Sequence, residues 1–425
     1  MHNAIRHKNG LMINFDRFEL DNGLQVIVHQ DKTTPIAAFN LLYKVGSRDE
    51  NPERTGFAHL FEHLMFEGSI NVKDYDHQIQ IAGGENNAFT NTDFTNYYIT
   101  LPKQNLETAF WLESDRMLGL DFSEKKLEIQ KNVVIEEFNQ RYLNNPYGDW
   151  MLMIRSLAYH RHPYMWPTIG KNTFQINHTK LSEVEAFFYK YYAPNNAILV
   201  VAGDVDVDEV KRLANKWFGP IPRRNIPVRN LPAEPKQSIP QTLIVKRDVP
   251  TNAIYKAYHM DGRLGPDYHA SNLISDILAG GDSSRLTQHL VKQKKTFVSI
   301  NAYITGESDP GLFIIEGKLS DNISFEQAEE SIKAELKLLC NNDVTENELT
   351  KVKNNIEMRN IVGEVNVLNK AMNLARFTML GDTNLINTNI SYYQKVTTAD
   401  ITNISRKIFT PDNCSTLIYK SSQNG

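Results

Sequence analysis

The stretch YKVGSRDENPERTGFAHLFEHL at residues 43–64 decides how this chain is organised, because a weaker copy of it returns much later. The copy is YHMDGRLGPDYHASNLISDIL at residues 258–278, and in register Pro52 matches Pro266. Both stretches begin as an apolar strand, pass through a polar turn and continue with helical spacing of their apolar residues. The first half of the chain and the second half therefore share one local pattern.

A second echo follows in the same order. SEKKLEIQKN at residues 123–132 is matched by TENELTKVKN at residues 345–354. Two echoes in one order predict a duplicated domain, since a solenoid array would repeat about every 20–50 residues. Between the halves, GPIPRRNIPVRNLPAEPKQSIPQ holds six of the 17 prolines, which is typical of a linker. We expect an N-terminal domain at 1–225, a proline-rich linker at 226–240 and a homologous C-terminal domain at 241–425.

The fold class follows from the mixture of elements. FELDNGLQVIVHQD alternates apolar and polar residues around Asn22-Gly23, which predicts a tight β-hairpin. Strand-like and helical segments then mix without the regular rhythm of βαβ units. We therefore expect an α+β protein with two homologous domains, each a largely antiparallel sheet packed with helices.

Composition excludes several classes of function. The chain of 425 residues has 41% hydrophobic residues, 23% charged residues and a formal net charge of -4. With no basic tail, nucleic acid is not an expected partner. No apolar run approaches the roughly 18 residues of a membrane span. The two cysteines and the absence of a visible signal peptide favour the cytoplasm, with the periplasm as the alternative if a signal peptide has been removed.

The motif HLFEH places three polar side chains on one face of the first predicted helix. His59, Glu62 and His63 lie at i, i+3 and i+4. In register, the second half has Leu273, Asp276 and Ile277. Because the second copy does without the histidines, we interpret the trio as serving chemistry rather than the fold. The alternative is a pair of surface histidines beside a solvated glutamate.

Two imidazoles one helical turn apart can bind one zinc ion, and a neighbouring carboxylate can accept a proton from water. HxxEH reverses the order of HExxH and is a zinc peptidase motif. His160 and His162 are also close in sequence, but they fall in an apparent loop, and we interpret them as structural.

A catalytic zinc site needs a third protein ligand. In the downstream helix predicted around residues 130–138, five residues at helical spacing should form one inward-facing stripe. Its members are Gln130, Val133, Val134, Glu137 and Phe138. A carboxylate in such a stripe is costly to bury without a cation, so Glu137 is the candidate third ligand. Glu136 lies toward the edge, where we expect a solvated or supporting group.

These motifs together resemble the pitrilysin-type zinc peptidases, the group that includes insulin-degrading enzyme and mitochondrial processing peptidase. HLFEH, VVIEEF, GGENNAFTNTDFTNYY and YYAPNNAILVVAGDV carry the resemblance. It implies one Zn²⁺ per chain, bound by His59, His63 and Glu137, with Glu62 as general base. The implied activity is endopeptidase hydrolysis of extended peptides or unfolded segments inside a clam-shell chamber.

The resemblance also implies a substrate-binding strand. Asn87, Ala88 and Phe89 fall where family members hold the backbone of an extended substrate against a sheet edge. A well-packed edge strand without that role is the open alternative.

The sequence departs from the family pattern at two places, and the first bears on partners. Active family members carry an Arg and a Tyr in the C-terminal half that help hold the substrate carbonyl, whereas alignment places Val291 and Val298 there. We therefore expect the zinc-bearing half of a two-subunit enzyme whose homologous partner supplies the Arg/Tyr pair, or a homodimer.

Gln130 stands where many relatives have a Glu that supports a zinc-binding His. The alternative function is a non-catalytic scaffold or peptide-binding subunit of the same family.

Overall fold

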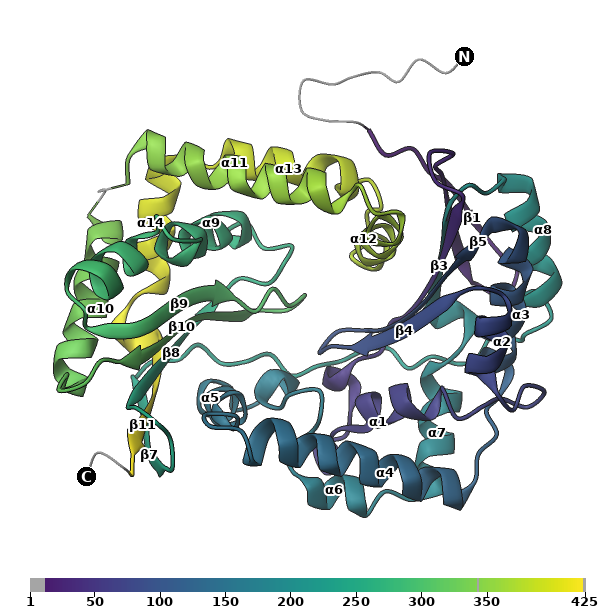
Figure 1. Cartoon of the computed structure of the whole chain (residues 1–425), viewed down its shortest axis with the longest axis horizontal. Coiled ribbons are helices and arrows are strands. Elements are labelled where there is room, and N and C mark those ends of the chain that lie inside the picture. The colour runs from purple at the N-terminus through teal and green to yellow at the C-terminus, as the bar shows by residue number, and fades with distance from the viewer. Residues whose placement is uncertain (1–11, 342–343, 423–425) are drawn as a thin grey trace. The chain divides into compact units, whose positions relative to one another are not determined.

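The computed structural model describes residues 12–341 and 344–422, and the chain divides into two compact units (Figure 1). The first unit consists of the chain up to Phe138, Thr168–Leu231 and Arg359–Thr388; the second consists of Asn139–Pro167, Pro232–Met358 and the chain from Asn389 onward. Both units are therefore assembled from separate stretches of sequence. The proposed division of the chain at 225 and 240 into homologous halves stays a prediction. Residues 226–240 contain neither helix nor strand.

The first unit contains a six-stranded sheet. Its strands are β1 (Asp16–Glu19), β2 (Gln25–Gln30), β3 (Ile36–Tyr43), β4 (Glu85–Thr90), β5 (Thr95–Pro102) and β6 (Ala197–Gly203). They lie in the order β1-β2-β6-β3-β5-β4, and only β2 and β6 pair in parallel. The Asn22-Gly23 turn connects β1 to β2 as predicted, with Gly23 at φ 88°. Strand β4 is an edge of this sheet.

The second unit contains a five-stranded sheet. Its strands are β7 (Gln241–Arg247), β8 (Ala253–Met260), β9 (Phe297–Ile304), β10 (Gly311–Leu319) and β11 (Cys414–Ser421). They lie in the order β7-β11-β8-β10-β9, with only β7 and β11 parallel. This is the order of the last five strands of the first sheet, β2-β6-β3-β5-β4. The prediction of two homologous α+β domains with largely antiparallel sheets is confirmed.

Helices cover both faces of each sheet. In the first unit they are α1 (Phe57–Leu64), α2 (Tyr75–Ile81), α3 (Leu106–Leu118), α4 (Glu124–Phe138), α6 (Thr173–Asn177), α7 (Leu181–Tyr191), α8 (Val207–Trp217) and α12 (Val367–Met379). In the second they are α5 (Trp150–Ala158), α9 (Tyr268–Ala279), α10 (Phe325–Cys340) and α14 (Thr398–Ile408). Helices α11 (Glu346–Gly363) and α13 (Leu385–Lys395) run across unit boundaries. In the described part of the chain, no helix combines the length and apolar character needed to cross a bilayer.

Each sheet is covered on one face by a helix from the other half of the sequence. Helix α12 buries Ala371 and Leu374 against Leu42 and Val200 of the first sheet (Figure 1). Helix α5 similarly packs against the second sheet, in a cluster that includes Leu312 and Leu417. These buried apolar contacts explain why the compact units interleave in sequence.

A buried cation lies inside the first unit, between the sheet and α3. The Arg116 guanidinium lies 4.1 Å from the ring centre of Tyr75 and 4.8 Å from that of Tyr97. It forms an ion pair with Glu113, which also accepts a 2.6 Å hydrogen bond from the Tyr75 hydroxyl. Both charged side chains are 1% exposed. Because burial removes both charges from water, each depends on the other for compensation.

Replacement of Arg116 by Met should strongly destabilise the protein, because it leaves the Glu113 carboxylate buried without its cation. The expected cost is about 3–5 kcal/mol. The control is Lys216→Met, which breaks an exposed ion pair with Glu107 and should cost at most about 1 kcal/mol. Urea-induced unfolding of the purified variants measures both. Equal shifts of the unfolding midpoint in the two variants would contradict this account of the buried pair.

Candidate metal centre

The direction of α1 is set by a buried carboxylate and by a glycine at its N-terminus. Glu50 accepts hydrogen bonds from the backbone N–H groups of Gly56, at 3.0 Å, and of Ala58, at 2.8 Å. A carboxylate at this end satisfies helix N–H groups and complements the helix dipole. Gly56 has φ 89°, and a Cβ there would lie 2.6 Å from the carbonyl oxygen of Ile169. The chain therefore enters α1 in one close-packed arrangement.

The two histidines of α1 converge on one carboxylate from α4. The His59 and His63 rings are 4.9 Å apart and nearly perpendicular, at 83°. Glu137 Oε2 lies 3.6 Å from His59 Nε2 and 3.5 Å from His63 Nε2. Within residues 12–341 and 344–422, this is the one group of three or more His, Cys, Asp or Glu side chains close enough to share a metal ion.

The distances from Glu137 Oε2 to the two Nε2 atoms, 3.6 Å and 3.5 Å, fit zinc. Tetrahedral zinc with bonds of about 2.0–2.1 Å places its ligand atoms about 3.4 Å apart. The side chains are partly exposed, at 13% for His59, 25% for His63 and 19% for Glu137. Two imidazoles and one carboxylate are also a donor set found in catalytic zinc sites.

Glu62 lies beside this group but is held by a different partner. The Thr90 hydroxyl donates a 2.5 Å hydrogen bond to Glu62 Oε2. Burial raises the pKa of the Glu62 carboxyl above its ordinary value, and Glu137 adds to the rise, while the Thr90 hydrogen bond and His63 oppose it. A carboxylate with a raised pKa is a better proton acceptor than an ordinary glutamate, as general base catalysis requires.

The predicted inward stripe of α4 is wrong at Val133, which is 43% exposed. The buried residues of α4 are Leu127, Lys131, Val134 and Phe138. The helix is therefore rotated so that Gln130 and Glu137 lie on the border of its buried face rather than within it. This rotation leaves Glu137 at the surface of the core, where it can meet α1. Glu136 is exposed, as the sequence predicted.

Gln130 makes its contact away from the two histidines. Its side-chain amide donates a hydrogen bond to Glu67, just beyond the end of α1. The glutamine therefore links α4 to the chain that follows α1. In this structure the Gln130–Glu67 hydrogen bond connects the two segments that carry the candidate metal ligands.

Asn87, Ala88 and Phe89 lie in β4, at the edge of the first sheet. Ala88 pairs with Tyr97 of β5 and, by strand alternation, shares a face with Thr90. The side chains of Asn87 and Phe89 are exposed on the opposite face. Because Thr90 contacts Glu62, this edge strand ends beside the candidate metal centre.

The corresponding helix of the second half carries no such group. Leu273 and Ile277 of α9 are fully buried in the apolar core of the second unit. Val291 packs against the same core, and Val298 in β9 is 61% exposed. Neither valine side chain can donate a hydrogen bond. This agrees with the sequence interpretation that the duplicated framework folds without the HxxEH trio.

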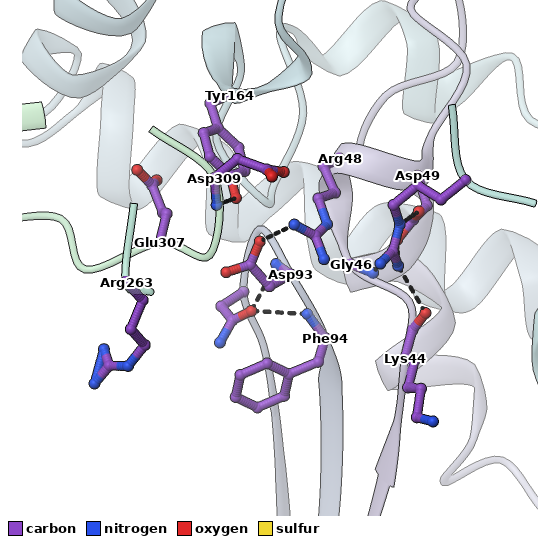
Figure 2. A network of polar contacts seen from close by, with 12 residues as sticks. Lys44, Gly46, Arg48, Asp49, Asp93, Phe94, Tyr164, Arg263, Glu307 and Asp309 are labelled. Carbon is purple, nitrogen blue, oxygen red and sulfur yellow. Dashed lines mark hydrogen bonds and ion pairs between the residues drawn. The ribbon is translucent and has the colours of Figure 1, made fainter. Parts of the chain in front are cut away.

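The other histidine pair has structural contacts. His162 Nδ1 accepts a 3.2 Å hydrogen bond from the backbone N–H of Tyr164 and so caps a short 3₁₀ turn. The Tyr164 hydroxyl accepts from the backbone N–H of Asp309, 3.1 Å away (Figure 2). His160 is exposed, and its backbone N–H donates to Glu234.

Sequence reasoning missed two residues that shape the centre. Glu50 lies 6 and 8 residues before the N–H groups that it binds at the start of α1, and Thr90 lies 28 residues from Glu62. The signal for Glu50 was an acidic residue before a predicted helix start. For Thr90 it was the alternation from Ala88, which places both residues on one face of the strand.

Comparison with known proteins matches both halves of the chain. The family described as Insulinase (Peptidase family M16) matches residues 25–164, which contain the candidate metal ligands. The Peptidase M16 inactive domain matches residues 180–356. The word "inactive" agrees with a second half that lacks the histidines.

Individual relatives agree with these matches. The zinc protease PqqE of Helicobacter pylori is 31% identical over 360 residues, which are 83% of this chain and 80% of that protein. The crystal structure of a protease from Helicobacter pylori has a TM-score of 0.90 at 28% identity and covers 96% of this chain and 100% of that chain. The periplasmic protease PqqL of Escherichia coli shares the fold, with a TM-score of 0.79 at 18% identity, covering 97% of this chain and 48% of that chain. The chain belongs to peptidase family M16, the insulinase family.

Proposed function

We propose that this protein is a zinc-dependent endopeptidase that hydrolyses extended peptides or unfolded protein segments. One observation carries the proposal: a carboxylate oxygen of Glu137 lies within 3.6 Å of both α1 imidazoles, with the separate carboxylate of Glu62 on the same helix face. Membership of a peptidase family supports the reaction type, and the name of the PqqE relative supports zinc.

His59, His63 and Glu137 would hold the ion. Bound zinc supplies Lewis acidity, which polarises a carbonyl group and makes water a nucleophile near neutral pH. Glu62 takes the proton from the attacking water and later passes it to the leaving amine. Its placement one residue before His63 keeps the carboxylate close to the reacting atoms without making it one of the three ligands.

We assign substrate binding to β4. The outer side of this edge strand is where an extended peptide could add as a further strand, with main-chain hydrogen bonds giving affinity for many sequences. Asn87, Ala88 and Phe89 are the proposed contact residues. Because β4 ends at Thr90, a peptide along it would run toward Glu62.

A partner chain completes the proposed enzyme. Val291 and Val298 cannot hydrogen-bond a substrate carbonyl, so a homologous subunit, or a second copy of this chain, is proposed to contribute to the substrate chamber. The fold of this chain spans 48% of the PqqL chain, which is therefore long enough for two such folds. The cytoplasm remains our proposed compartment, with the periplasm as the alternative.

Replacement of Glu62 by Gln should abolish hydrolysis while the protein keeps its metal. General base catalysis contributes about 10²–10⁴-fold, so kcat should fall by at least about 100-fold. A quenched-peptide assay and zinc analysis of the same preparation measure both quantities. Normal cleavage by the variant would remove Glu62 from its assigned role. A wild-type protein that binds zinc and peptide without turnover, even with a partner present, would favour the scaffold alternative.

Replacement of Glu137 by Gln should weaken zinc binding, because the amide is a poorer ligand than the carboxylate. Loss of a group that merely supports a ligand costs about 10–100-fold in metal affinity, so loss of a ligand should cost at least about 10-fold. Competition with a chromogenic chelator measures the affinity. The neighbouring exposed Glu136→Gln is the matched control and should bind zinc normally. Equal affinity in both variants would exclude Glu137 as a ligand.

The purified chain should have low activity as a monomer and gain activity with its homologous partner subunit or by self-association. Light scattering during gel filtration gives the oligomeric state of the preparation assayed. Full peptidase activity from a homogeneous monomer would eliminate the need for a partner.

A further inference from the structure

The contact between Thr90 and Glu62 joins two elements that have separate places in the proposed reaction. Thr90 is the last residue of β4, and its hydroxyl donates to Glu62 Oε2 over 2.5 Å. Strand β4 is the proposed peptide-binding edge, and Glu62 is the proposed base. The hydroxyl binds Oε2, and the backbone of Thr90 also contributes a hydrogen bond to the Glu62 carboxylate.

The turn that follows Thr90 is held in one conformation. Asn91 Oδ1 accepts hydrogen bonds from the backbone N–H groups of Asp93, at 2.8 Å, and of Phe94, at 2.9 Å. The Asn91 N–H donates to the Phe94 carbonyl at 3.0 Å. This arrangement is an Asx turn, in which the side chain substitutes for a backbone partner. It fixes the point at which β4 ends and therefore the position of Thr90.

A neighbouring segment, residues 46–50, holds that turn. The Ser47 N–H donates to the Asn91 carbonyl at 3.1 Å, and the Arg48 N–H donates to the Thr92 carbonyl at 3.0 Å. Figure 2 shows the Arg48 side chain paired with Asp93, 2.8 Å away. Both charged side chains are nearly buried, at 6% and 8% exposure. Buried, hydrogen-bonded ion pairs of this kind restrict the geometry of the groups they join.

The same segment also holds α1. Its last residue, Glu50, binds the N–H groups of Gly56 and Ala58 at the helix start. Residues 46–50 therefore contact both the turn after Thr90 and the helix that carries Glu62. The separation between this turn and α1 is therefore constrained by one short segment before any ligand binds. A hydrogen bond that forms within such a frame is preorganised.

We infer that Thr90 is a positioning residue for the reaction: its hydroxyl holds Oε2 of Glu62 and so orients the carboxylate for its role as general base. This inference rests on the proposed peptidase function. Thr90 acts through Glu62 and need not touch the substrate carbonyl or the metal. Its loss should lower the rate of the chemical step and leave substrate affinity and metal affinity in place.

A merely structural role for Thr90 makes a different prediction. If the hydroxyl only attached β4 to α1, its removal would loosen the edge strand. The melting temperature would then fall and KM for the peptide would rise, while kcat of the folded fraction stayed near the wild-type value. The separation of kcat from KM therefore distinguishes the two roles.

The test compares Thr90→Val, which keeps the shape and removes the donor, with Thr90→Ser, which keeps the donor. We expect Thr90→Val to lower kcat by about 10–100-fold, the usual cost of removing a supporting hydrogen bond at a metal site. KM, melting temperature and zinc affinity should remain close to wild type. Thr90→Ser should restore most of kcat. Thr100→Val, the same change on the paired strand β5, is the matched control and should have wild-type activity.

Crystal structures of the zinc-free wild type and Thr90→Val give a readout independent of turnover. The Glu62 carboxylate should leave its wild-type position in the variant and keep it in Thr90→Ser. The inference would be overturned by any of three results for Thr90→Val. These are an unchanged position of the Glu62 carboxylate, an unchanged kcat, or an effect confined to KM and stability. A wild type that stays inactive as an oligomer and with its partner subunit present would contradict the proposed function, and the position of Glu62 in these structures would still test whether the Thr90 hydroxyl holds the carboxylate.

Discussion

The candidate centre depends on one constraint: α1 and α4 must stay close enough for a single carboxylate oxygen to reach two imidazoles. His59 and His63 are one turn apart on a single helix, so their spacing is a property of the helix itself. Glu137 comes from a different helix, and its Oε2 lies 3.5 Å and 3.6 Å from the two Nε2 atoms. The cap of α1 by Glu50 and the hydrogen bond between Gln130 and Glu67 are among the contacts that position these two helices.

Duplication separates the requirements of the fold from those of the chemistry. The second sheet repeats the order of five of the six strands of the first sheet. Along the chain, each half has a helix after the second of these shared strands, α1 after β3 and α9 after β8. The helix of the second half, α9, buries Leu273 and Ile277, whereas α1 has partly exposed histidines at the matching positions. Polar side chains cost free energy to remove from water, so the helix face of α1 is less favourable for folding than that of α9. A bound cation would offset that cost.

Local patterns predicted much of this molecule and tertiary packing decided the rest. The HxxEH spacing predicted which side chains share a face, and the internal echo predicted two similar units. The predicted inward-facing stripe of α4 was wrong at Val133. Periodicity gives the width of the apolar face of a helix, but it does not give the rotation of the helix about its axis relative to the elements that it packs against. Nothing local indicated that α12 packs on the first sheet, since an amphipathic helix does not specify its partner. Thr90 was missed because its contact with Glu62 is set by the end of a hairpin.

The central claim is that two histidines and one glutamate from two helices bind a single zinc ion. The most direct measurement is an anomalous difference map at the zinc absorption edge, from crystals of the protein grown with zinc. The account predicts one strong peak in the first unit, within about 2.0–2.1 Å of His59 Nε2, His63 Nε2 and a Glu137 oxygen. A zinc peak coordinated by other side chains, or by the histidines without Glu137, would contradict it.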